Sequence, residues 1–139
     1  MFAFQSARVS VVIVAHPITT LGVHQLTVGE AATLSNRGLF GFDSAVLTAM
    51  GRAEVRLLAT HLLVARGVVC EGYTDYAGQA GHELTLSRQR SAAVCAALVA
   101  YGADVRTYTR GYGQARPVIV GGTPVSREAN RRVVVVVTA

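Results

Sequence analysis

Apolar residues along the chain follow a period of two in some segments and of three to four in others. Val9 to Ala15 and Val68 to Thr74 are short apolar runs of the kind that form covered strands. Five consecutive valines within residues 132–138 predict a strand buried on both faces. Two shorter strands are predicted at Leu39 to Phe42 and at Val105 to Arg110, the second with one solvated face.

Two longer stretches follow the helical period. Between Ala45 and Ala65 apolar residues recur at steps of three or four, which predicts a helix capped at its start by Asp43 or Ser44. A second helix is expected from about Leu84 to Tyr101. The resulting order is β–α–β–α–β–β with extra strand material at the N-terminus. It predicts an α/β (α+β) sandwich of two main helices packed on a mixed sheet.

Composition limits the classes of partner. The chain has 139 residues, is 51% hydrophobic and only 15% charged, which suits one well-packed domain. Its net charge of +5 comes entirely from arginine, an excess that favours anionic partners in general. Because the arginines are scattered, we favour a compositional bias over nucleic-acid binding as their origin.

Neither a membrane span nor an export signal is expected from the sequence. No apolar run reaches the roughly 18 residues that a membrane-spanning helix needs. Val9 to Ala15 is preceded by a single charge, Arg8, and no small-residue cleavage site follows it, so a strand is the better interpretation.

The residues that usually carry catalysis or metals show no suitable pattern. Cys70 and Cys95 lie in apolar surroundings without metal-ligand spacing, and we expect free buried thiols, although the sequence leaves a disulfide open. The four histidines lack metal spacing as well, and no nucleophile motif is present. We therefore expect neither an enzyme nor a cofactor.

Residues 72–90 carry the most informative pattern. They resemble the signature of the OmpA/MotB/Pal family, in which Gly-x-Thr-Asp is followed at fixed spacing by a glycine, Leu-Ser and an arginine. The matching positions are Gly72, Thr74, Asp75, Gly78, Leu86, Ser87 and Arg90. Further similarity to the family occurs at residues 39–45, 111–117 and 130–133. The resemblance predicts an OmpA-like domain over residues 33–139 and an N-terminal extension over residues 1–32.

The resemblance implies a non-catalytic anchor in the periplasm or cell envelope that binds the peptidoglycan stem peptide through its diaminopimelate residue. It implies that Asp75 binds the ammonium group of this residue and that Arg90 binds its carboxylate. Thr74, Asp43, Glu83 and Asn130 complete the implied set of ligand-binding residues.

The position of Arg90 supports this role on physical grounds. It lies on the predicted core-facing row of the second helix, where an arginine costs free energy unless it is paired or liganded. Its side chain leans towards the helix N-terminus, whose free N–H groups favour anions. A plain ion pair between Asp75 and Arg90 is the structural alternative.

Two residues depart from the family pattern. Tyr73 replaces the usual histidine, and Glu83 replaces the usual asparagine. An ionised carboxylate only accepts hydrogen bonds, so Glu83 would repel the carboxylate of the ligand. The alternative function is therefore a structural or protein-interaction module on the same fold with weak or lost wall binding. Its partners would be envelope proteins or a second copy of the chain.

Overall fold

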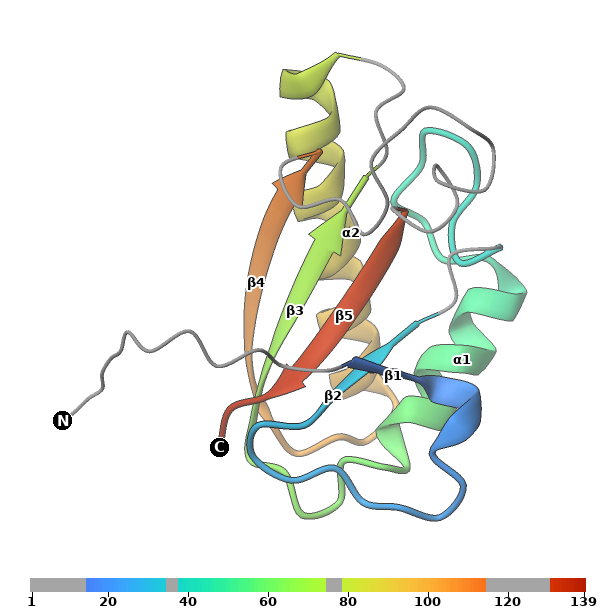
Figure 1. Ribbon diagram of the computed structural model, residues 1–139. Coiled ribbons are helices and arrows are strands. Elements are labelled where there is room, and N and C mark those ends of the chain that lie inside the picture. Colours follow the sequence, from blue (N-terminus) through green and yellow to red (C-terminus); the bar gives the residue numbers. More distant parts are fainter. Residues whose placement is uncertain (1–14, 35–37, 75–78, 115–130) are drawn as a thin grey trace, which may run out of the picture.

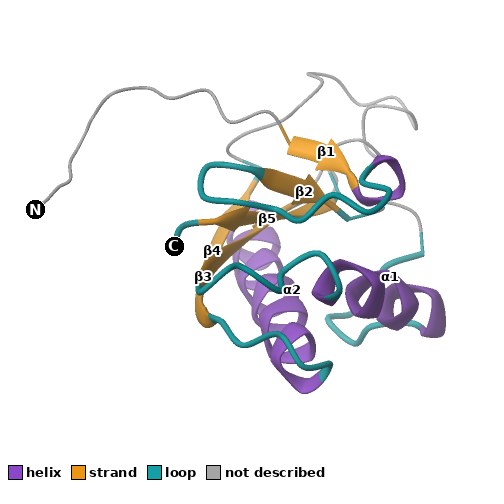
Figure 2. Ribbon diagram, turned by 90° about the horizontal axis from the view of Figure 1, so that it is seen from below, coloured by secondary structure: helices purple, strands orange, loops and turns teal. Residues whose placement is uncertain are grey.

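The computed structural model describes residues 15–34, 38–74, 79–114 and 131–139. Two helices cover one face of a five-stranded sheet of order β1-β2-β5-β3-β4 (Figures 1 and 2), which confirms the predicted sandwich. The elements are β1 (Ala15–Pro17), the 3-10 turn η1 (Ile18–Thr20), β2 (Ala31–Thr33), α1 (Ala49–Ala59), β3 (Gly67–Tyr73), α2 (Ala80–Ala100), β4 (Arg106–Gly113) and β5 (Arg132–Val137).

The sheet is mixed and has the valine strand at its centre. β5 is antiparallel to both β2 and β3, while β3 is parallel to β4 and β1 is parallel to β2. The residues from Val133 to Val137 are all buried. Val133, Val135 and Val137 belong to the core under the helices, and Val134 and Val136 belong to a smaller cluster with Ala31 and Tyr73 on the opposite face. Because β2 pairs with β5, residues 31–33 belong to the same sheet as the rest of the chain. The proposed division between residues 32 and 33 stays a prediction.

The main core lies between the helices and the sheet. Leu58 from α1, Leu98 from α2 and Val135 from β5 are all fully buried there. Leu26 and Leu34 join the same cluster, so the segments on either side of β2 also contribute to it.

The first helix is shorter than predicted. It begins at Ala49 instead of Ala45, and its N-cap is Thr48, whose hydroxyl accepts the N–H of Gly51 at 2.9 Å. The predictions of a cap at Asp43 or Ser44 and of a strand over residues 39–42 are wrong. Residues 39–47 instead form a turn closed by one antiparallel bridge between Phe40 and Leu47. The β-like pattern at its start reflects that single bridge.

The second helix begins earlier than predicted, at Ala80, so that Glu83 lies in its first turn. Gly102 follows its end with φ of 103°, a left-handed conformation that glycine adopts without steric cost. None of the described helices combines the length and hydropathy that crossing a bilayer requires.

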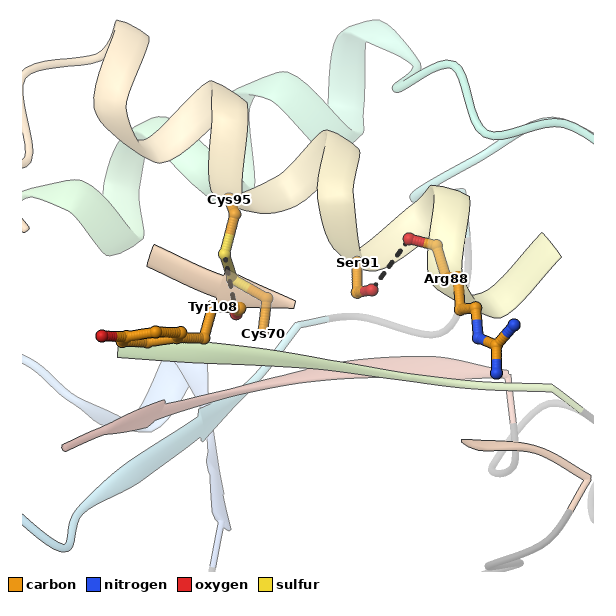
Figure 3. The surroundings of a disulfide bond; sticks show 5 residues. All are labelled: Cys70, Arg88, Ser91, Cys95 and Tyr108. Atoms are coloured by element: carbon orange, nitrogen blue, oxygen red, sulfur yellow. Dashed lines mark hydrogen bonds between the residues drawn. A yellow bond between two sulfur atoms is a disulfide. The ribbon is translucent and has the colours of Figure 1, made fainter. Parts of the chain in front are cut away.

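The expectation of free thiols is wrong, because a disulfide joins Cys70 of β3 to Cys95 of α2 (Figure 3). Their Cα atoms are 6.1 Å apart, within the range that a disulfide spans. Both residues are buried, so the bond fixes the helix to the sheet inside the core. Sequence spacing cannot reveal such a pairing, since it depends on which helical residue lies above the strand.

Candidate functional site

The close approach of α2 to the ends of β3 and β4 positions the candidate site. A Cβ atom on Gly72 would overlap the carbonyl oxygen of Ser87, and one on its strand partner Gly111 would overlap Arg88. The hydroxyl of Ser87 accepts the N–H of Gly113 at 3.0 Å and donates to Leu84 O at 2.8 Å. The Gly72 and Ser87 positions of the motif are thus explained by helix–sheet contact.

Arg90 lies one turn further along α2 and reaches the turn of residues 41–44. Its Nε donates to Ser44 O at 2.8 Å and its Nη2 donates to Gly41 O at 3.2 Å. The guanidinium carbon is 5.1 Å from the centre of the Phe40 ring, which is a cation–π contact. These contacts explain how a partly buried arginine is tolerated, and they fix the plane of its guanidinium group.

A second residue of α2 holds the same turn through a side chain. His82 Nε2 donates to Asp43 Oδ1 at 2.5 Å, and both side chains are about half exposed. Asp43 has φ of 50°, a conformation that non-glycine residues seldom adopt. The hydrogen bond to the Asp43 carboxylate is the main reason why the pKa of His82 is raised, and the charge of Glu83 acts in the same direction.

Thr74 immediately follows β3 and is 2% exposed. Its N–H donates to Gly113 O at 2.8 Å, but its buried hydroxyl has no hydrogen-bond partner among the residues that the structure describes. A buried hydroxyl without a partner costs about 1–3 kcal/mol. Thr74 thus pairs with β4 through its backbone and has a buried polar group beside the predicted site.

On the opposite face of the sheet, an aromatic cluster fixes the end of β3. The Tyr73 ring lies 3.8 Å from the guanidinium carbon of Arg132 and stacks on Tyr112 with a centroid distance of 5.2 Å. The Tyr73 hydroxyl donates to Glu71 at 3.1 Å. Burial is the main cause of the raised pKa of Tyr73 and of the lowered pKa of Arg132. Tyr73 thus fills the usual histidine position as a structural residue.

The predicted site residues are only partly within the described chain. Arg90, Asp43 and Glu83 lie on α2 or on the turn that α2 contacts, and Thr74 lies at the adjacent end of β3. Asp75 and Asn130 lie outside the described residues, so their predicted contacts stay predictions. Sequence reasoning missed the role of His82, and only its place next to Glu83 could have drawn attention to it.

A match to a family model defines the class of this protein. The model of the OmpA family matches residues 39–131. The chain therefore belongs to the OmpA family, as the motif and its spacing indicated.

Among curated proteins, the peptidoglycan-binding protein ArfA of Mycobacterium tuberculosis is 42% identical over 71 residues, which are 50% of this chain and 22% of ArfA. The outer-membrane lipoprotein YfiB of Pseudomonas aeruginosa is 32% identical over 109 residues, which are 76% of this chain and 65% of YfiB. The chain thus spans less than two thirds of either relative.

Two solved structures with the same fold are a peptidoglycan-associated lipoprotein and a cell wall anchor. The peptidoglycan-associated lipoprotein of Burkholderia pseudomallei has a TM-score of 0.61 and 29% identity, covering 70% of this chain and 86% of that one. The cell wall anchor of the T6SS from Pseudomonas aeruginosa has a TM-score of 0.69 at 24% identity, over 78% of this chain and 80% of that one. The second likeness concerns the fold alone.

Proposed function

We propose that this chain anchors a protein or complex to the cell wall by binding the diaminopimelate residue of the peptidoglycan stem peptide. In this proposal Arg90 binds the carboxylate of that residue and Asp75 binds its ammonium group. No chemical step is involved, so the protein acts as a binding module and not as an enzyme. The names of ArfA and of the Burkholderia lipoprotein, both tied to peptidoglycan, support this class of ligand.

The placement of Arg90 is the observation that carries the proposal. α2 holds its guanidinium against the carbonyl groups of Gly41 and Ser44. A guanidinium that is fixed before the ligand arrives loses little conformational freedom on binding. Its planar group of N–H donors suits a carboxylate, which it can bind through two parallel hydrogen bonds.

Two neighbours bear on the strength of binding. The partnerless hydroxyl of Thr74 would gain a hydrogen bond from a polar ligand at the end of β3. Glu83, at the usual asparagine position, would repel a ligand carboxylate, whereas the guanidinium of Arg90 on the same helix would attract it. We therefore infer that binding survives the replacement of the asparagine.

The disulfide and the relatives support a location in the cell envelope. Structural disulfides form and persist in oxidising compartments outside the cytoplasm. The buried Cys70–Cys95 bond fits such a compartment, as does the outer-membrane lipoprotein YfiB among the relatives.

The proposal is tested by co-sedimentation with purified sacculi. Arg90→Ala should weaken binding by about 2–5 kcal/mol, because the substitution removes a charged, partly buried contact. Arg52→Ala is a matched control, since Arg52 also donates from a helix to a carbonyl group of the 39–47 segment, at Leu47. Circular dichroism should show that both variants remain folded.

Titration with free diaminopimelate separates wall binding from the alternative function. We expect chemical-shift changes at the amides of Thr74 and Ser44 at millimolar ligand. If the Arg90 and Arg52 variants sediment equally with sacculi, Arg90 is not a ligand-binding residue. No shift changes together with no sedimentation of the unsubstituted protein would instead favour the protein-interaction module.

A further inference from the structure

The outer edge of β4 is unpaired among the described strands. β4 is the last strand of the sheet and pairs with β3 alone, as Figure 1 shows. Arg106 N–H donates to Arg66 O at 2.9 Å, on the side of β3. Because a parallel strand bonds to one neighbour through every second residue, the N–H and C=O groups of Thr107 and Thr109 point outwards. The edge therefore offers backbone groups that an added strand could pair with.

Cationic and aromatic side chains line this edge on both faces of the sheet. On the face away from the helices lie Arg106, Tyr108 and Arg110, all exposed, at alternating positions of β4. Tyr108 is opposite Val69 in the register, and Val69 belongs to the cluster on that face. On the helix face, the exposed Arg88 of α2 lies against Gly111 of β4. An occupant of the edge would thus meet positive charge on either side.

These three arginines differ from the other arginines of the described chain. Arg52 and Arg66 donate to carbonyl groups, and Arg56 lies over the Tyr101 ring. Arg90, Arg131 and Arg132 are also engaged. Within the part of the chain that the structure describes, only the guanidinium groups of Arg88, Arg106 and Arg110 have no hydrogen bond, ion pair or ring contact. Partnerless cations are thus concentrated at one strand edge.

We propose that the β4 edge binds an extended acidic segment of another protein, which adds to the sheet as an additional strand. Main-chain hydrogen bonds to Thr107 and Thr109 would supply affinity, as in other strand additions. Acidic side chains at alternate positions would face Arg106 and Arg110, and such cross-strand pairs are stabilising.

Charge and backbone chemistry favour this occupant over two others. A second copy of the chain, paired through β4, would bring six partnerless arginines together. A nucleic acid would meet the arginines but would leave the outward backbone groups of the strand without partners. An acidic peptide satisfies both the charges and the backbone.

This inference is independent of wall binding. In Figure 1, β4 lies at one side of the sheet and the 39–48 segment beyond the other side. A result at one surface therefore leaves the proposal for the other unaffected.

The test uses the whole chain and a capped synthetic peptide of alternating glutamate and threonine. We expect the amide signals of Thr107 and Thr109 to shift on titration. Arg106→Gln/Arg110→Gln should weaken binding at least about fivefold, because two cross-strand charge pairs are lost. Arg52→Gln/Arg56→Gln on α1 lowers the net charge equally and should leave the affinity unchanged.

Two further probes decide between strand addition and plain charge attraction. The same peptide with alternate backbone amides methylated keeps its charge but cannot form the ladder, and we expect it to bind much more weakly. Polyphosphate should leave the Thr107 and Thr109 amides unshifted. Equal binding of the methylated peptide, equal affinity of both double variants, or no shifts at millimolar peptide would each overturn the proposal. In the last case the arginines would serve to keep the edge from pairing.

Discussion

The two halves of α2 contact the rest of the protein in different ways. The C-terminal half is buried through Val94 and Leu98, and the Cys95 disulfide fixes it to β3. The N-terminal half is buried at Leu86 and Ser87, but it also makes polar contacts, in which His82 and Arg90 bind the 41–44 turn. One continuous helix thus joins an apolar region that is fixed by a disulfide to a region whose outer contacts are polar.

The difference separates the contacts that contribute most to stability from the polar contacts around the proposed binding site. Burial of apolar side chains and a disulfide each contribute kilocalories per mole, whereas exposed polar contacts contribute little net free energy. The N-terminal half of α2 can therefore vary its polar residues, as at His82 and Glu83, without loss of the fold. Four substitutions test this separation, from the largest expected effect to the smallest.

Removal of the disulfide should affect the C-terminal half most. Cys70→Ala/Cys95→Ala should lower the free energy of unfolding by roughly 3 kcal/mol, as expected for a loop of this length. Urea denaturation measures the loss, and the reduced unsubstituted protein should reproduce it. An unchanged midpoint in both samples would show that the apolar contacts alone fix this half of the helix.

Gly72→Ala tests the contact between β3 and the N-terminal half of α2. Its methyl group would overlap the Ser87 carbonyl, so we expect a loss of about 1–3 kcal/mol in stability. Gly81→Ala within α2 is a matched control, because a Cβ atom there meets nothing within 4 Å and alanine favours helix. Equal thermal stability of the two variants would contradict the close approach.

Tyr73→Phe removes the hydrogen bond to Glu71 and should cost about 1 kcal/mol. The pKa of Tyr73 is raised above 10.0 in the folded state, so the folded state favours the protonated phenol. The contribution of this phenol to the free energy of unfolding is complete below pH 10 and is lost as the pH rises further. The phenylalanine variant should lack this alkaline loss. Tyr108→Phe, at a half-exposed tyrosine, is the control. Its free energy of unfolding should equal that of the unsubstituted protein both below pH 10 and above it.

His82→Gln should have the smallest effect on stability and a visible effect on the 41–44 turn. Since the pKa of His82 is raised above 6.5, its ion pair with Asp43 is complete below that pH and is lost as the pH rises through the raised value. The Ser44 amide should therefore titrate with His82 in NMR spectra. A titration that persists in the glutamine variant would assign it to another group.

Much of the fold could be predicted because its signals are local. The valine strand, the order of helices and strands, and the position of Arg90 all follow from periodicity or from the spacing of one motif. The errors occurred where local signals compete. Asp43 and Ser44 resemble a helix N-cap, yet Thr48 serves as the cap because the bridge between Phe40 and Leu47 keeps the preceding residues in a turn.

The sequence by itself determined the family, the layer architecture and the glycines that allow α2 to approach the sheet. Three features follow only from the tertiary structure. They are the Cys70–Cys95 bond, the hydrogen bonds of His82 and Arg90 to the 41–44 turn, and the concentration of partnerless arginines at the β4 edge. The physical reason is distance along the chain. Contacts such as that between Asp43 and His82 join residues far apart in sequence, and neither residue carries a local sign of its partner.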